Sequence, residues 1–491
     1  MVEISRKRLV NDSAWSVMSA VSNSVFGFGY LIVIGNTWKS GGLGIFSLCM
    51  SLYLIGSLLF NLGIHNAVLY EVAASGEDKK RASGFVYSAL LGSLILGASG
   101  GVLGFIFSGP IAAVFREPLM INMVKVFAFA LPLFLLNKTA LGILNAHRRM
   151  RLLAAVQIMR GGTILIYLVS AMIFKAGFSA IPYGFILAES LIMLLLLTAC
   201  VRTHSFASPT LQRTKRLVSF GWKAGLSGII GDVNTRLDIL VIGIFWDSSI
   251  VGVYSVASAI AKGLWLVPSA IQRVTNPLIV QLYTADEKDK LHRTMDVLLR
   301  LGTSIFAVIA LVLAIYIKPL IGLIYPDQPD MAGAAIPLYF LLPGATVFSG
   351  IAMLGSAPST SIGRPENALK LSVIVLGVNL IFNIILVPVF AGAGAASATT
   401  VSLLAALFFF FYLCKKELDF EIPLGKLVGL FCLLCFLIAI TVRFGNSVSH
   451  LVFLVAELII TAAILTAIRM VRKSDWNLFL SVLKSFADSK Q

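Results

Sequence analysis

Charged and amide side chains interrupt long apolar runs of this sequence, and they are the residues best suited to chemistry. Asp232 and Arg236 are four residues apart with the acid first, so a helix would place them on one face, where they can pair. Lys223, Ser227, Asn234 and Asp238 form a second stripe of the same run. A charge at mid-bilayer costs roughly 2.5–3.5 kcal/mol on insertion scales, so such groups usually face a cavity or a partner. We therefore expect a hydrated cavity beside this run.

The candidate site combines residues of this run with charged and amide residues of other apolar runs. Six cationic or amide residues are predicted to bind an anionic substrate: Arg236, Lys262, Arg160, Lys223, Asn234 and Asn23. Three carboxylates are candidates for coupling transport to an ion: Asp232, Glu189 and Asp238. Structural alternatives remain open, since Asp232 and Arg236 can form a purely structural pair and Lys223 can extend its ammonium to the membrane surface.

The sequence lacks the motifs of bond-making chemistry. It has no phosphate-binding glycine loop followed by Lys and Ser or Thr, no nucleophile elbow and no histidine-rich metal motif. Cys432 and Cys435 have the spacing of a redox or zinc pair, but no second pair accompanies them, and we interpret them as small apolar side chains. We expect no enzyme activity, no catalytic or metal-binding residue and no cofactor.

The composition excludes a water-soluble protein. Of 491 residues, 58% are hydrophobic and 13% are charged, and the mean hydropathy is +0.93. Soluble globular proteins have about 45–50% apolar and about 25% charged residues. The net charge of +16 needs no nucleic-acid partner if the basic residues gather in cytoplasmic loops. The sequence thus predicts an integral membrane protein.

The apolar runs predict fourteen transmembrane helices. They span about 13–35, 42–64, 84–107, 120–143, 152–174, 178–201, 217–245, 249–271, 297–317, 333–356, 369–390, 393–413, 423–442 and 449–470. Lys and Arg alternate strongly between the connections, with 27 on one side and 5 on the other. Because cytoplasmic loops carry the excess of Lys and Arg, both termini are predicted to be cytoplasmic.

An internal repeat organises these helices. Tyr30–Leu48 and Asp238–Val256 align without a gap at an offset of 208 residues, and 7 of 19 positions are identical. The repeat unit is therefore six spans, and an even number gives two copies of the same orientation. We expect an all-α fold with two parallel six-helix lobes, residues 1–204 and 205–416, around a central cavity. Two further helices (417–472) and a cytoplasmic amphipathic tail (473–491) would follow.

Several short motifs resemble those of the polysaccharide flippase family, within the multidrug/oligosaccharidyl-lipid/polysaccharide exporter superfamily. In chain order they are Leu62-Gly63-Ile64-His65-Asn66-Ala67, Arg236-Leu237-Asp238, Gly252-Val253-Tyr254-Ser255 with Pro268, Asn276-Pro277, Gly363-Arg364-Pro365, and Asn383 through Pro388 to Gly392-Ala393-Gly394. Each motif alone is weak, but their order and the fourteen-span plan make the resemblance fairly specific over nearly the whole chain.

The resemblance implies a flippase of the O-antigen type, which moves polyprenyl-pyrophosphate-linked oligosaccharide from the cytoplasmic to the outer leaflet by alternating access. It implies a multi-pass protein of a bacterial or archaeal inner or plasma membrane, acting in cell-surface polysaccharide synthesis as a monomer. Candidate partners are membrane lipid, protons or sodium, and polysaccharide-assembly enzymes. The alternatives are an ion-coupled multidrug extruder, a lipid II flippase, or an integral-membrane polysaccharide polymerase.

Overall fold

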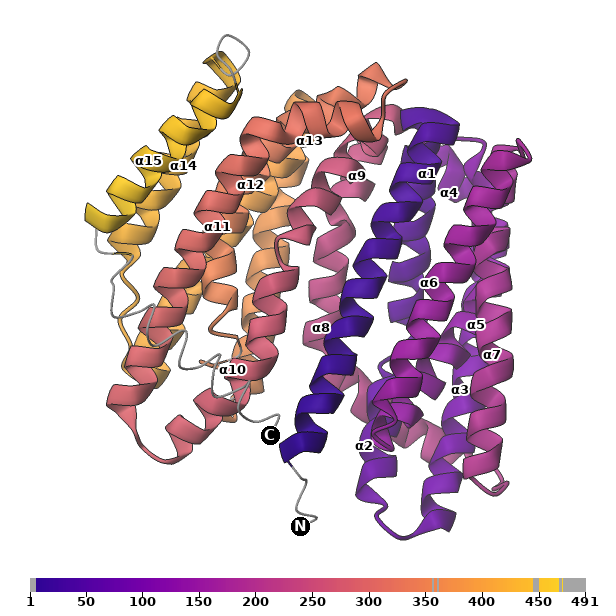
Figure 1. Ribbon diagram of the computed structural model, residues 1–491. Helices are drawn as coiled ribbons and strands as arrows, with labels where there is room; N and C mark the ends of the chain where they lie inside the picture. The colour runs from indigo at the N-terminus through magenta and orange to yellow at the C-terminus, as the bar shows by residue number, and fades with distance from the viewer. Residues whose placement is uncertain (1–5, 356, 360–361, 445–449, 468–469, 471–491) are drawn as a thin grey trace. The chain divides into compact units, whose positions relative to one another are not determined.

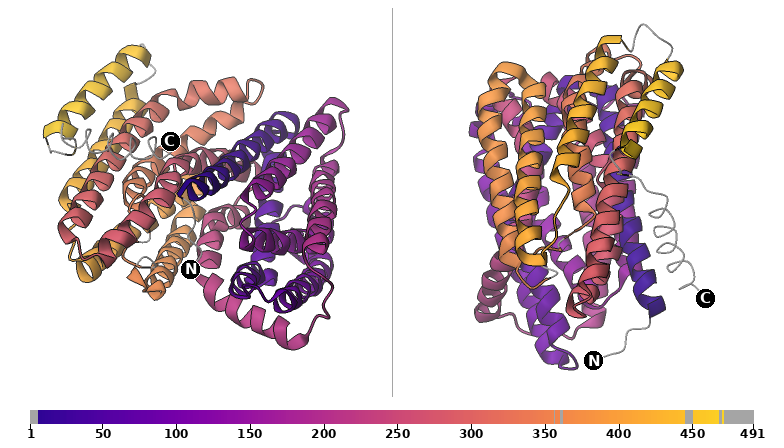
Figure 2. Two further views of the ribbon diagram at one scale, coloured as in Figure 1. Left: turned by 60° about the horizontal axis from the view of Figure 1, so that its bottom comes forward. Right: turned by 90° about the vertical axis from the view of Figure 1, so that its left-hand side faces the viewer.

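A computed structural model describes the chain except for residues 1–5, 356, 360–361, 445–449, 468–469 and 471–491. Regular structure in the described residues is entirely helical, which confirms the all-α expectation (Figures 1 and 2). The helices are α1 (Arg6–Asn61), α2 (Ile64–Ala74), α3 (Lys79–Ile106), α4 (Ser108–Val114), α5 (Met120–Ala146), α6 (Met150–Ile173), η1 (Phe178–Ala180), α7 (Tyr183–Thr203), α8 (Leu211–Phe245), α9 (Ser248–Gly263), α10 (Leu266–Thr284), α11 (Lys288–Ile324), η2 (Pro329–Ala334), α12 (Ala335–Ala352), α13 (Pro365–Leu418), α14 (Leu424–Phe444) and α15 (His450–Ala467).

Nine helices in the described part of the chain are long and apolar enough to cross a membrane. Two of these, α1 and α13, are each interrupted by a residue of positive φ, Lys39 at 61° and Ala391 at 49°. A right-handed helix cannot continue through such a residue, so each break separates two consecutive expected runs. The other expected runs also fall on helices. The number fourteen stays a prediction, and the expected tail at 473–491 lies outside the described residues.

The helices form two compact units, which are described separately. One unit holds residues 10–255, and the other holds residues 256–491 together with residues 1–9. The first unit thus contains nearly all of α1, all of α2 to α8 and the beginning of α9. The lobe boundary at residue 204 and the central cavity remain predictions.

Within the first unit, the two copies of the repeat meet at a close crossing of α1 and α9. A Cβ atom added to Gly44 would overlap the carbonyl oxygen of Ser248, and one added to Gly252 would overlap that of Ser40. Gly252 and Ser248 lie 208 residues after Gly44 and Ser40, so the contact is reciprocal. Reciprocal contacts of this kind indicate a local two-fold axis, as expected for two copies of one orientation.

A second close approach joins α2 to α8 in the same unit. Gly63, at φ +72°, precedes α2, and a Cβ at either Gly63 or Gly221 would overlap the backbone of the other residue. Glu71 of α2 is buried and receives two arginines, with Arg216 Nε of α8 at 2.6 Å and Arg81 Nη2 of α3 at 3.5 Å. The close contact between the two glycines and this ion cluster hold the N-terminal part of α8 against α2 and α3.

In the second unit α12 packs along both α11 and α13, and α14 and α15 pack against α11. Some polar groups in its helices bind close neighbours, and others are buried without a hydrogen-bond partner in the described residues. Arg300, one of the largest buried side chains, binds Asp296 one turn earlier at 2.8 Å. Thr441 of α14 donates to Glu457 of α15 at 2.8 Å, which joins the two added helices.

The α2–α8 approach predicts a large difference between two glycine substitutions. Gly63→Ala should prevent the close packing of the two backbones, whereas Gly76→Ala meets open space at a similar φ of +54°. The control should lose only about 1–2 kcal/mol, the cost of a left-handed L-residue. Thermal denaturation of both purified variants in detergent measures the difference, and equal losses would contradict the contact.

Candidate functional site

A buried ion pair connects α6 and α7 in the first unit. Arg160 Nε lies 2.9 Å from Glu189 Oε1, and Nη2 donates to Oε2 at 3.1 Å. The Nε contact is an ion pair without a hydrogen bond. Asn137 of α5 donates to Glu189 Oε2 at 2.7 Å and to its backbone carbonyl at 2.8 Å. The carboxylate side chain is only 3% exposed and both its oxygens are occupied.

Aromatic rings surround this pair. The guanidinium of Arg160 lies over the ring of Phe134 at 5.4 Å, and its Nη1 donates to Gln157 at 3.1 Å. The Phe134 ring in turn lies 5.3 Å from that of Tyr53, measured between centroids. Tyr30 donates to the carbonyl of Gly161 at 3.0 Å. The predicted substrate residue Arg160 and the predicted coupling residue Glu189 are therefore partners, which the sequence analysis did not foresee.

Lys138 is a further cation of the site that the sequence analysis did not single out. It follows Asn137 on α5, is largely buried, and lies close enough to Asp232 and Arg160 to interact electrostatically with both. Its ammonium forms no hydrogen bond or ion pair with the described side chains. The sequence itself could have indicated Lys138, because a lysine within the apolar run 120–143 carries the cost of an intramembrane charge and such residues usually face a cavity or a partner.

On α8, the middle of the helix carries polar atoms that lack partners. Arg236 interacts electrostatically with Asp232, but the two make no direct ion pair among the described side chains. Nε of Arg236 and Oδ1 of Asn234 are buried, and each lacks a hydrogen-bond partner in the described residues. A buried donor without a partner costs about 1–3 kcal/mol. Lys138 and Arg236 are therefore the groups with most to gain from a bound anion, whereas the Asn234 oxygen would accept from a hydroxyl such as that of a sugar.

The remaining candidates are placed less closely together. Asp238 is buried on α8 and accepts a hydrogen bond from Tyr254 at 2.6 Å. Lys223 is exposed near the other end of α8, and Asn23 is exposed on α1. Lys262 ends α9 and belongs to the second unit, so the first unit does not bring it together with the others.

Two histidines outside the spans form a pair that the sequence analysis did not propose. The Nε2 atoms of His147, after α5, and His204, after α7, lie 3.1 Å apart. Burial lowers the pKa of His204, and so does the nearby His147; burial and the charge of Arg149 lower the pKa of His147. The described residues contain no cluster of three or more His, Cys, Asp or Glu suited to a metal ion.

The ion pair predicts an asymmetric response to substitution. Glu189→Ala would leave the Arg160 charge buried and unpaired, which costs about 3–5 kcal/mol, whereas Arg160→Met with Glu189→Leu should recover most of that loss. Thermal denaturation in detergent measures both, with the exposed Glu77→Ala as the control. A single variant as stable as the double variant would show that the pair is unimportant.

Relatives with similar sequences are named as flippases. "Probable flippase AglR" of Haloferax volcanii is 25% identical over 398 residues, which cover 80% of this chain and 80% of that protein. "Probable low-salt glycan biosynthesis flippase Agl15" of the same organism is 21% identical over 195 residues, 40% of this chain and 41% of that protein.

Solved transporters share the fold. A lipid II flippase MurJ in an inward closed conformation gives a TM-score of 0.73 at 15% identity, covering 93% of this chain and 98% of that chain. An inward-facing multidrug resistance MATE family transporter of the MOP superfamily gives 0.66 at 15% identity, covering 85% and 98%. These similarities confirm the expected transporter fold.

The family of the chain follows from its sequence. Residues 42–331 match the family described as "Polysaccharide biosynthesis protein", and this segment is more than half of the chain. The match agrees with the resemblance drawn from the short motifs. The chain belongs to the polysaccharide biosynthesis protein family.

Proposed function

We propose that this protein is a flippase that moves a polyprenyl-pyrophosphate-linked oligosaccharide from the cytoplasmic to the outer leaflet, for synthesis of a cell-surface polysaccharide. The observation that carries the proposal is the set of buried polar atoms on α5 and α8. The Lys138 ammonium and Arg236 Nε lack acceptors in the described residues, whereas the neighbouring Arg160 is neutralised by Glu189. A diphosphate would supply acceptors to these donors by charge-assisted hydrogen bonds.

We infer that transport proceeds by alternating access. The reciprocal α1–α9 crossing supports this, because it is a symmetric contact between corresponding residues of the two repeat copies. We place the crossing on the outer side of the membrane, since Lys39 beside it belongs to the connections with few basic residues.

Three other functions make different demands. A lipid II flippase carries the same kind of lipid diphosphate, so only the sugar distinguishes it, and the similarity to MurJ keeps it as the second candidate. A multidrug extruder for cations would need acids facing its substrate, but Glu189 and Asp238 are engaged by neighbours, and Asp232 lies near the cations Lys138 and Arg236. A polymerase would need a catalytic group, and both relatives are named as probable flippases.

The remaining expectations belong to this proposal. Both termini would lie in the cytoplasm of a bacterial or archaeal cell, and the protein would act as a monomer beside polysaccharide-assembly enzymes. Protons or sodium would drive the cycle. Among the three coupling candidates, Asp232 has the most accessible carboxylate, since its side chain is exposed and its charge faces Lys138 and Arg236.

The function is tested by the sidedness of the glycan lipid. Depletion of the protein in its own cells should trap the lipid-linked oligosaccharide in the cytoplasmic leaflet, as measured by its accessibility to an external lectin or glycosidase. Normal exposure in cells without a compensating flippase would overturn the proposal.

Neutralising either unpartnered cation should slow translocation. Lys138→Gln and Arg236→Gln each remove a charged donor, and the expected loss of rate is on the order of tenfold. Lys125→Gln is the control, because this lysine of the same helix α5 interacts instead with the ring of Phe105 at 5.1 Å. Full activity of both test variants at normal expression would remove these residues from the site.

Widening the α1–α9 crossing should favour the outward-open state. Gly44→Ala and Gly252→Ala add methyl groups where backbones touch, whereas Gly27→Ala on α1 meets open space. The separation of the two helices is measured by pulsed electron paramagnetic resonance between spin labels on cysteines introduced at Lys39 and Asp247, which are exposed and 208 positions apart. The five native cysteines are replaced beforehand. Longer distances are expected for the two test variants only. Unchanged distances would contradict a closing role.

A further inference from the structure

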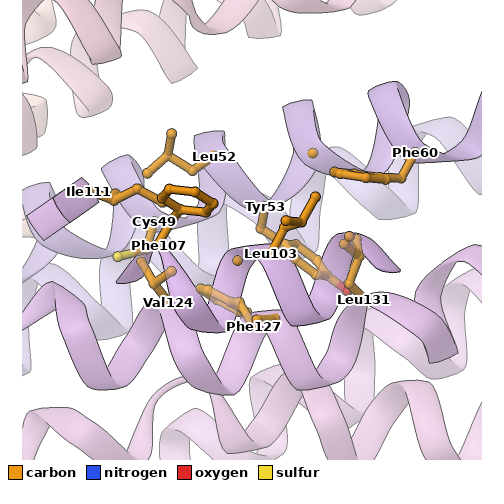
Figure 3. Close-up of a pocket in the computed structure, with 14 residues that line it drawn as sticks. Cys49, Leu52, Tyr53, Phe60, Leu103, Phe107, Ile111, Val124, Phe127 and Leu131 are labelled. Atoms are coloured by element: carbon orange, nitrogen blue, oxygen red, sulfur yellow. The ribbon is translucent and has the colours of Figure 1, made fainter. Parts of the chain in front are cut away.

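A cavity of about 250 Å³ opens within the first unit, between α1, α3, α4 and α5 (Figure 3). Its lining consists of apolar side chains and glycines apart from one hydroxyl and one thiol, those of Tyr53 and Cys49. Leu103 and Phe107 are about half exposed, at 44% and 51%, and form its outer part. Because α1, α3 and α5 are membrane-spanning candidates, the cavity lies at membrane depth and suits a hydrocarbon.

Glycines create this hollow. Gly56 of α1 has no atom within 4 Å of an added Cβ, so a side chain there would project into free space. On α3, Gly101 packs against the backbone of Ala128 on α5, which brings the two helices together without filling the space beside them. The hollow is therefore a consequence of close helix packing with small residues, and side chains of ordinary size would fill it.

The inner part of the cavity holds a buried polar atom without a partner. Tyr53 is 7% exposed, and its hydroxyl has no hydrogen-bond partner in the described residues. Its ring stacks on Phe127 at 4.9 Å, and both rings line the cavity (Figure 3). Buried hydroxyls are normally satisfied, so this one indicates a ligand group or a water at the inner end.

The same tyrosine connects the cavity to the ionic site. Its ring lies 5.3 Å from that of Phe134, over which the Arg160 guanidinium lies at 5.4 Å. Tyr53 also interacts electrostatically with Glu189 and Arg160. A path of adjoining rings thus runs from the hydrocarbon-lined hollow to the charged network in the middle of the unit.

We propose that this cavity binds the isoprenoid chain of the lipid-linked substrate while the diphosphate is held near Lys138 and Arg236. The inference rests on the proposed function. A membrane phospholipid keeps its headgroup at the surface, whereas this cavity begins beside an ionic site at mid-helix depth. One molecule with an anionic head and a long hydrocarbon tail accounts for both features, with the tail leaving toward lipid past Leu103 and Phe107.

The test uses photo-crosslinking of the full-length protein in vesicles. The probes are a polyprenyl diphosphate with a diazirine in its first isoprene units and, separately, a phosphatidylethanolamine with a diazirine in its acyl chain. The prenyl probe should label peptides within residues 98–111 and 124–131, and the phospholipid probe should label them much less. Gly56→Leu, which fills the hollow, should lower prenyl labelling about tenfold.

Two further variants make the result specific. Gly429→Leu on α14 also adds a leucine where no atom lies within 4 Å, and labelling should be unchanged. Leu103→Trp enlarges an exposed side chain at the cavity mouth and is the second filling variant, used if Gly56→Leu does not fold. It should also lower prenyl labelling. Equal labelling by both probes, or prenyl labelling that neither filling variant reduces, would overturn the proposal.

Translocation of the glycan lipid separates failure of this inference from failure of the function. If wild-type protein translocates the glycan lipid and Gly56→Leu matches it in rate and labelling, the cavity is not the chain site and the flippase proposal stands. If prenyl labelling behaves as expected but the wild type moves no glycan lipid, the chain site stands and the transport proposal falls.

Discussion

The cost of placing charge in the membrane interior governs the arrangement of the first unit. Arg160, Glu189 and Asn137 form a closed network in which each charged group has a close partner. Lys138 and Arg236 lie near this network with Asp232 as the nearby acid, and the Nε of Arg236 is left without an acceptor in the described residues. Such groups are costly unless a ligand completes them, so selection for binding explains their presence better than selection for stability.

Glycines determine how closely the helices around this network approach. At Gly44 and Gly252 the two repeat copies touch backbone to backbone, and at Gly63 and Gly221 the same kind of approach fixes α8. Around Gly56, by contrast, the missing side chain leaves a hollow. Glycine thus supplies two close backbone contacts between helices and an apolar cavity within one unit.

The sequence predicted the helices well, because apolar runs and charge alternation are local signals; even the breaks at Lys39 and Ala391 fall between expected runs. The repeat offset was also visible, and the Gly44–Gly252 crossing follows it. Partners between helices were not predictable. Arg160 and Glu189 are 29 residues apart on different helices, so no spacing rule joins them. Lys138 is a lone charge in the run 120–143, and only the folded structure brings it near Asp232 and Arg160.

Recognition of a lipid diphosphate by the Lys138 and Arg236 region is the central claim, and reconstituted vesicles test it most directly. Purified protein would be compared for transbilayer movement of one oligosaccharide linked to polyprenyl diphosphate or to polyprenyl monophosphate. The account predicts much faster movement of the diphosphate lipid, with the preference lost in the double variant Lys138→Gln/Arg236→Gln. Equal rates for the two lipids, or a preference that survives in the double variant, would contradict it.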